Sequence, residues 1–270
     1  MSLSSHHARI VTALALGAAV AVAVAVGGWA VFAAVCLISC AGLWEFYSMF
    51  WPGRHTPRKI LGGLFGCGLL LAEFLGQPGW ALGLFVAAFW TSNLAFLFRF
   101  AKDPSQSTGS EAFANSTIMV AGLMYLPLLL QFFFRFGPAE MVLVIAATLA
   151  SDTGAYYAGS WCGKRKIWPA VSPKKTWMGS FGGLACCMAV CLGLGVWQGV
   201  APWWAWCGLG VALNVAAQFG DFVESAMKRS LDVKDSGRLL PGHGGILDRI
   251  DGLLLAVPVY AAARTLSTFF

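Results

Sequence analysis

The residues best suited to chemistry gather in one segment of 33 residues, from Gly220 to Gly252, near the C-terminal end of the chain. It holds six of the 12 Asp and Glu residues and five of the 18 Lys and Arg residues, although only 11% of the chain is charged. Apolar stretches flank it on both sides. Charge beside lipid is costly unless it is paired or binds a ligand. We therefore expect this segment to hold a phosphate group together with a metal ion.

Four polar residues in this segment have the spacing of one helix face. Asp221 and Glu224 are three residues apart, and Ser225 and Lys228 follow at four and seven residues from Asp221. Such residues project from the same side of a helix, with the carboxylates first and the cation last. The plainer alternative is an intramolecular salt bridge at a helix end.

A second pair of carboxylates, Asp248 and Asp251, repeats this spacing where the last apolar stretch begins. The helix dipole alone would favour acids there, but it does not explain the turn Gly242–Gly245 (Gly-His-Gly-Gly) between the two pairs. Those glycines allow backbone N–H groups to approach a ligand closely. Carboxylates from two helices can hold Mg²⁺ through oxygen ligands, while a substrate phosphate completes the coordination.

Two further polar segments precede this one. The patch Ser151–Gly154 (Ser-Asp-Thr-Gly) interrupts an apolar stretch, either as part of a site or as a polar contact between helices. Ser172–Thr176 (Ser-Pro-Lys-Lys-Thr) belongs to a basic loop that suits a triphosphate or a lipid phosphate, or that simply marks a cytoplasmic loop. The small residues after it open a helix whose N-terminus is suited to an anion; they are Ser180, Gly182 and Gly183.

The elements that position these residues are apolar helices. The chain has 270 residues, 58% of them hydrophobic, and about 20 apolar residues are enough for a helix to cross a bilayer. We predict an all-α polytopic integral membrane protein with about nine transmembrane helices. The expected ranges are 10–26, 29–49, 60–76, 80–98, 116–134, 139–159, 178–198, 202–226 and 250–269.

The basic residues predict the orientation of these spans. With the N-terminus inside, 16 of the 18 Lys and Arg residues fall in cytoplasmic segments, and only Arg135 and Arg264 fall outside. Short cytoplasmic loops are enriched in positive charge, so we predict an N-in, C-out topology. The net charge of +6 is then mostly this topology signal, and it would also suit anionic lipid headgroups or a polyphosphate.

Several kinds of protein lose support. Seven of the eight cysteines lie in apolar runs and no paired CxxC occurs, so neither a disulfide framework nor a structural zinc site is expected. The patterns GxxxxGK[ST], HExxH and GxSxG are absent. The first apolar run is too long for a cleaved leader. We expect no soluble domain and no nucleic-acid partner.

With these residues in view, a family resemblance emerges. The segment Ser225–Asp251 closely resembles the signature of the phosphatidate cytidylyltransferases, also called CDP-diacylglycerol synthases. Ser151–Gly159 and Ser172–Trp177 resemble two further segments of that family, in the same order. The resemblance covers roughly residues 145–255, whereas residues 1–140 are similar only in being hydrophobic.

The resemblance implies a reaction in which CTP and phosphatidic acid give CDP-diacylglycerol and pyrophosphate at the cytoplasmic face of a membrane. It implies Mg²⁺ (or Mn²⁺), with K⁺ as a second cation. Metal binding is expected at Asp221 and Asp248, with Asp251 and Glu224 as supporting or alternative ligands. Besides Asp221 and Asp248, the expected catalytic residues are Lys228, Arg229 and His243. The expected substrate contacts are Ser151, Asp152, Ser172, Lys174, Lys175, Thr176, Ser225, Lys234, Arg238, Gly244, Gly245 and Arg249.

One position departs from the family's pattern. The family commonly has an acid followed by glycine after the Ser172–Trp177 segment, and here Met178 precedes Gly179. If that acid orients a lysine or a metal-bound water, its role is missing or is supplied elsewhere. Glu45 and Asp152 are the candidate substitutes. Glu45 lies near the inner end of the second predicted span, where a purely interfacial placement is the alternative.

The predicted organisation has two parts. Residues 1–140 (spans one to five) would serve packing, dimer formation or lipid access, and residues 141–270 (spans six to nine) would form the catalytic membrane domain. We expect a homodimer in the bacterial cytoplasmic (inner) membrane. Other lipid-phosphate nucleotidyl- or phosphotransferases remain alternatives, although the DGxxAR…GxxxD pattern of CDP-alcohol phosphotransferases is absent. A cation-coupled membrane transporter is the other alternative, but the charges cluster at one face instead of spreading through the spans.

Overall fold

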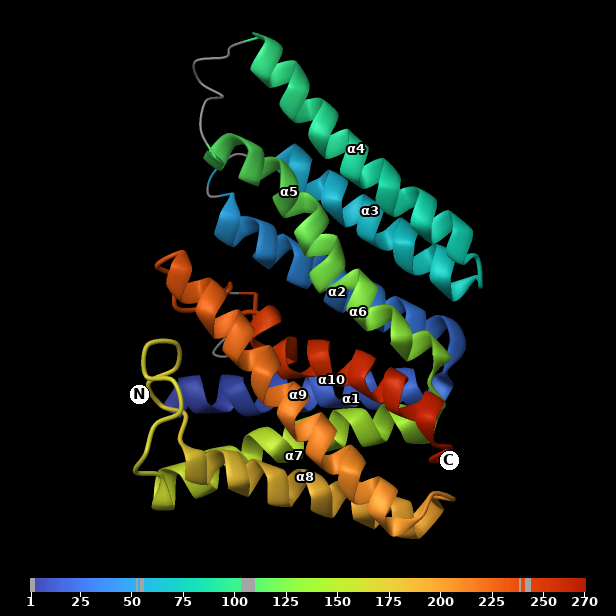
Figure 1. The fold of residues 1–270 in the computed structure, drawn as a ribbon, viewed down its shortest axis with the longest axis vertical. Helices are drawn as coiled ribbons and strands as arrows, with labels where there is room; N and C mark the ends of the chain where they lie inside the picture. Colours follow the sequence, from blue (N-terminus) through green and yellow to red (C-terminus); the bar gives the residue numbers. More distant parts are fainter. Residues whose placement is uncertain (1–2, 52, 54–55, 103–109, 238, 241–243) are drawn as a thin grey trace. The chain divides into compact units, whose positions relative to one another are not determined.

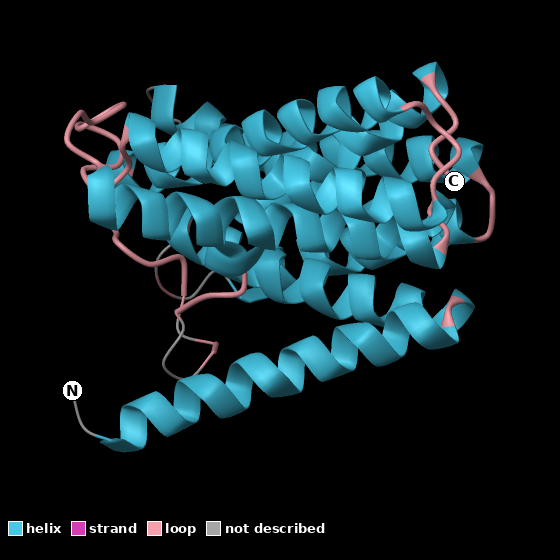
Figure 2. Ribbon diagram, turned by 90° about the horizontal axis from the view of Figure 1, so that it is seen from below, coloured by secondary structure: helices cyan, strands magenta, loops and turns pink. Residues whose placement is uncertain are grey.

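The computed structural model describes residues 3–51, 53, 56–102, 110–237, 239–240 and 244–270. Figure 2 shows helices joined by loops, and the residues described form no strand. The helices in chain order (Figure 1) are α1 (Leu3–Val26), α2 (Gly28–Phe50), α3 (Thr56–Phe74), α4 (Pro78–Lys102), α5 (Ser110–Tyr125), α6 (Pro127–Leu130), the 3₁₀ helix η2 (Gln131–Arg135), α7 (Pro138–Cys162), α8 (Trp177–Gln198), α9 (Trp203–Ser230) and α10 (Leu247–Leu266).

Every predicted helical range contains a helix, so the all-α prediction is confirmed for the residues described. The fifth range is divided where Pro127 begins α6, because proline cannot donate the backbone hydrogen bond that a continuous helix requires. Among the residues described, five segments are long and apolar enough to cross a membrane: Gly28–Phe50, Pro78–Lys102, Ser116–Arg135, Pro138–Cys162 and Trp177–Gln198. The count of nine crossings and their orientation stay predictions.

The chain divides into two compact units. The first comprises Met1–Phe134 and Asp235–Leu247, and the second comprises Arg135–Lys234 and Asp248–Phe270. The sequence predicted a division near residue 140, but it did not predict that a short segment from the C-terminal half belongs to the first unit. The functional roles assigned to the two parts stay predictions.

In the first unit, α2, α3 and α5 pack together (Figure 1), and the side chain of Tyr47 in α2 contacts both other helices. Tyr47 is fully buried, and its hydroxyl donates a hydrogen bond of 2.9 Å to the carbonyl oxygen of Met119 in α5. Its ring lies against Gly62 of α3 and Gly122 of α5; a Cβ atom at Gly122 would lie 2.6 Å from the ring. Glycines at these two positions therefore let three helices close on one aromatic side chain.

In the second unit, glycines bring α7, α8 and α9 close together. A Cβ at Gly154 of α7 would lie 2.6 Å from the carbonyl oxygen of Gly182 in α8, and one at Gly183 would lie 2.7 Å from that of Ser151. The sequence assigned Gly182 and Gly183 to an anion-binding helix start. Both glycines pack against the backbone of α7, and anion binding at this helix start stays a prediction.

The Tyr47 contact generates a stability prediction with a neighbouring control. We expect Gly62→Ala to lower the stability of the protein by about 2 kcal/mol, because overpacking against a buried ring that cannot move costs on that order. Gly63→Ala should leave stability unchanged or raise it slightly, since a Cβ at Gly63 meets nothing within 4 Å and alanine favours helix. The midpoints of thermal unfolding in detergent would show this; equal midpoints for the two variants would contradict it.

Candidate functional site

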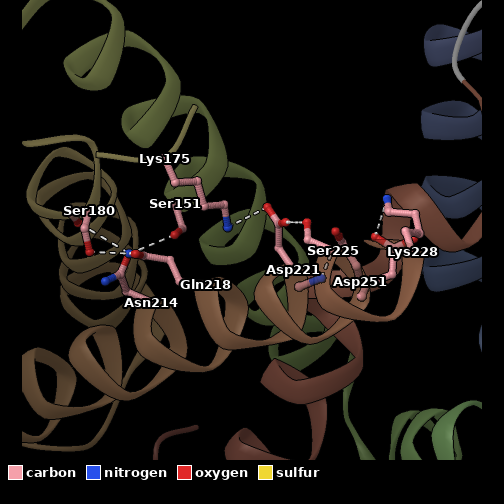
Figure 3. Close-up of polar contacts among 11 residues, drawn as sticks. Ser151, Lys175, Ser180, Asn214, Gln218, Asp221, Ser225, Lys228 and Asp251 are labelled. Carbon is pink, nitrogen blue, oxygen red and sulfur yellow. Dashed lines mark hydrogen bonds and ion pairs between the residues drawn. The ribbon is translucent and has the colours of Figure 1, made fainter. Parts of the chain in front are cut away.

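The predicted helix face of α9 is present, and each of its carboxylates has a hydrogen-bond partner (Figure 3). Ser225 Oγ donates to Asp221 Oδ1 at 3.1 Å. The Lys228 ammonium donates to Glu224 Oε2 at 3.0 Å and to Asp248 Oδ1 at 2.7 Å. Lys228 therefore joins α9 to the first turn of α10 through two carboxylates.

Close contact between α9 and α10 places the acids of both helices near one another. A Cβ at Gly252 would lie 3.1 Å from the carbonyl oxygen of Ala217, and Gly220 lies against the backbone of Asp251. Asp251 Oδ1 accepts a hydrogen bond of 2.7 Å from the backbone N–H of Gly252. The charge of Asp251 interacts with those of Asp221 and Asp152. Acids from α7, α9 and α10 therefore share one region of the second unit.

The basic loop between α7 and α8 turns back toward α9. Lys166 and Thr176 pair as an isolated antiparallel bridge, and the N–H of Ile167 donates to the carbonyl oxygen of Lys175 at 3.2 Å. This fold of the loop directs the Lys175 ammonium to Asp221 Oδ2, 2.6 Å away (Figure 3). The ammonium also lies 4.4 Å from the centre of the Phe222 ring, where a cation–π contact adds to the ion pair.

A pocket of about 450 Å³ opens beside this ion pair. Its volume falls within the range that small-molecule and cofactor sites occupy. The walls come from α7, the basic loop, α8 and α9, and include three lysines and two aspartates: Lys166, Lys174, Lys175, Asp152 and Asp221. Thr176 lies on the wall too, and its Oγ1 accepts a hydrogen bond of 3.1 Å from the N–H of Gly179 at the start of α8. The three polar sequence segments thus meet at one pocket within the second unit.

A chain of uncharged polar residues continues from the pocket into the helices (Figure 3). Ser180 Oγ donates to Gln218 Oε1 at 2.6 Å, and Gln218 Nε2 donates to Asn214 Oδ1 at 2.9 Å. The same Asn214 oxygen accepts from Ser151 Oγ at 2.8 Å. Ser151 is fully buried and does not line the pocket, which Asp152 does. Sequence reasoning missed Asn214 and Gln218, although two amides within an apolar helix were a visible signal.

The remaining predicted residues lie in different places. Arg229, Lys234 and Arg249 are exposed, and Ser172 is partly exposed, with its backbone N–H bonded to the carbonyl oxygen of Trp168. Gly244 and Gly245 belong to the first unit. Gly244 has φ +85° and its carbonyl oxygen accepts from the N–H of Leu240, whereas Gly242 of the predicted glycine turn lies outside the residues described. Arg238 and His243 lie outside the residues described.

The carboxylates fit a divalent cation in their chemistry. Asp221, Glu224, Asp248 and Asp251 supply the hard oxygen ligands that Mg²⁺ prefers, and Glu224 Oε1 is buried without a hydrogen-bond partner among the residues described. The described side chains do not already form a cluster of three metal-binding groups. Asp221 and Asp248 contact lysines instead, so a cation bound there would share these carboxylates with Lys175 and Lys228.

Comparison with known proteins identifies one family for this chain. The model of the cytidylyltransferase family matches residues 7–267. A phosphatidate cytidylyltransferase of Staphylococcus aureus (strain COL) is 38% identical over 152 residues, which are 55% of this chain and 58% of that protein. One of Brucella suis biovar 1 (strain 1330) is 35% identical over 193 residues, which are 71% of this chain and 59% of that protein.

These relatives are therefore matched over less than two thirds of their own length. The family model, in contrast, extends over nearly the whole chain, including the N-terminal helices that the sequence analysis could match only by hydrophobicity. The chain belongs to the cytidylyltransferase family.

Proposed function

We propose that this protein transfers the cytidylyl group of CTP to phosphatidic acid, giving CDP-diacylglycerol and pyrophosphate for phospholipid synthesis. The observation that carries the proposal is the pocket of the second unit, where lysines and carboxylates from three segments of the chain meet. Its lysines match the charge of a nucleotide triphosphate, and its carboxylates suit the cation that accompanies one. Both relatives are phosphatidate cytidylyltransferases, which supports phosphatidic acid and CTP as the substrate class proposed here.

The proposed chemistry is a direct displacement. A phosphate oxygen of phosphatidic acid attacks the α-phosphorus of CTP, a new P–O bond forms, and the bond to the β-phosphate oxygen breaks to release pyrophosphate. The lipid phosphate is already ionised, so a strong general base is not required. Lys174 and Lys175 would hold phosphate oxygens of CTP and of the leaving pyrophosphate, and catalysis would come from positioning and from neutralisation of charge.

A divalent cation, Mg²⁺ or Mn²⁺, belongs to this proposal. Asp221 and Asp248 would hold it, with Glu224 and Asp251 as further oxygen ligands, and K⁺ would act as a second cation. When bound, the divalent ion would neutralise charge on the nucleotide phosphates. The support from this chain is its donor set of four carboxylates, together with the buried Glu224 oxygen that has no hydrogen-bond partner among the residues described.

The membrane arrangement is also part of the proposal. We infer nine crossings with the N-terminus inside, an active site at the cytoplasmic face of a bacterial inner membrane, and a homodimer as the assembly. The distribution of Lys and Arg along the chain supports the orientation. The lipid tails would then stay in the bilayer while the headgroup reaches the pocket.

Removing the acid that contacts Lys175 tests the reaction. We expect Asp221→Asn to lower CDP-diacylglycerol formation by about 100-fold or more, the order found when one preorganised charge-stabilising group is lost. Purified protein would be assayed with radiolabelled CTP, phosphatidic acid and Mg²⁺. Asp232→Asn is the matched control, because Asp232 is exposed at φ +53°, where asparagine is tolerated. Wild-type turnover by Asp221→Asn would overturn this assignment.

The position of Lys175 in the basic loop leads to a separate prediction about the binding of CTP. Lys175→Gln should raise KM for CTP by about 10-fold to 100-fold, since a hydrogen bond to a charged group is worth about 1.5–3 kcal/mol. The exposed Lys164 in the same loop gives the control Lys164→Gln. Initial rates at varied CTP and fixed phosphatidic acid would separate the two, and an unchanged KM in Lys175→Gln would count against nucleotide binding by this loop.

A labelling experiment tests the orientation. In a variant that keeps only the exposed Cys162 at the end of α7, a membrane-impermeant maleimide should react in inverted vesicles and not in intact cells, because we place this end in the cytoplasm. A second variant, with Thr268→Cys as its only cysteine, should show the opposite pattern. Labelling of Cys162 in intact cells would reverse the proposed topology.

A further inference from the structure

Glu45, near the C-terminal end of α2, is buried within the first unit with 2% of its surface exposed. Its Oε2 atom accepts two hydrogen bonds from residues about 200 positions further along the chain. Ser236 Oγ donates at 3.2 Å, and the backbone N–H of Leu247 donates at 2.9 Å. A carboxylate taken out of water requires such donors. Glu45 therefore has protein hydrogen-bond donors of its own inside the first unit, and its depth in the membrane stays a prediction.

The segment that supplies these donors, Asp235–Leu247, is called here the anchored segment; its described residues are 235–237, 239–240 and 244–247. Two of its glycines lie against the Glu45 carboxylate. A Cβ at Gly245 would lie 2.5 Å from Oε2, and a Cβ at Gly237 would lie closer still to Oε1. The carboxylate thus fits between two positions where only glycine leaves room.

This contact holds both ends of the anchored segment. Ser236 lies at its beginning and is 5% exposed, while Leu247 lies at its end and is fully buried. Leu247 is also the first residue of α10, so it directly precedes Asp248 in the chain. A single carboxylate of α2 therefore bonds to both ends of the segment that directly precedes Asp248 in the chain.

We propose that Glu45 is a positioning residue for cytidylyl transfer, whose carboxylate holds the anchored segment in its working conformation. The inference rests on the proposed function, and it gives the N-terminal helices a part in the reaction beyond packing. Glu45 acts on the segment that the family resemblance ties to phosphate binding.

The first experiment measures how strongly Glu45 restrains the anchored segment, and its readout does not depend on enzymatic activity. In Glu45→Ala, amide hydrogen exchange within peptides covering 235–247 should become at least 10-fold faster than in the wild type, while peptides of α7 and α8 stay unchanged. Glu45→Gln should resemble the wild type, because an amide oxygen can still accept from Leu247 and Ser236. The control is Glu73→Ala, which removes another acid from a helix of the same unit. Unchanged exchange in Glu45→Ala would overturn the anchoring.

The second experiment measures the consequence for catalysis. We expect kcat of Glu45→Ala to fall by about 100-fold, with KM for CTP changed less than threefold and with activity largely rescued in Glu45→Gln. If Glu45→Ala does not fold, Gly237→Ala provides the same test, because its added Cβ would displace the segment from the carboxylate. Wild-type kcat together with fast exchange would overturn the positioning role. An inactive wild type would instead reject the proposed function, and the exchange result would still stand.

Discussion

The structure of the second unit depends on the pairing of carboxylates with two lysines. An isolated charge in a low-dielectric environment costs several kcal/mol, and α9 and α10 bring several acids together there. Lys228 bridges Glu224 and Asp248, and Lys175 reaches Asp221 from a separate loop. Each lysine connects parts of the chain that are distant in sequence. The charge that makes this region suitable for chemistry is therefore also what holds its loops and helices in place.

Helix packing decides whether these charges can meet. Side chains of ordinary size would keep α7, α8, α9 and α10 too far apart for one lysine to bridge two helices. Gly154 and Gly183 let α7 and α8 approach to backbone contact, and Gly220 and Gly252 do the same for α9 and α10. In an apolar protein, small residues of this kind are a common means of bringing helices together. None of these four glycines lines the pocket, so they influence the site through helix packing.

Local patterns in the sequence predicted the helices and the shared face of Asp221, Ser225 and Lys228, because helix periodicity depends only on near neighbours. Contacts between distant segments were harder to predict. The polar patch at Ser151 allowed a contact between helices, but nothing in its spacing identified Asn214 as the partner. The contacts of Gly182 and Gly183 with α7 were not predicted for the same reason, since a glycine's neighbours across a helix interface are not written in its own segment.

The carboxylates of Glu45 and Asp221 have different kinds of partner. This difference indicates different roles for the two residues. Asp221 contacts Lys175, whose long side chain can rotate toward a phosphate when one is present. Glu45 contacts a backbone N–H and a buried serine hydroxyl, and the N–H cannot leave without movement of the chain itself. Exchangeable partners suit a residue that must release one ligand and accept another. Fixed partners suit a residue that holds a segment still, so we assign chemistry to Asp221 and positioning to Glu45.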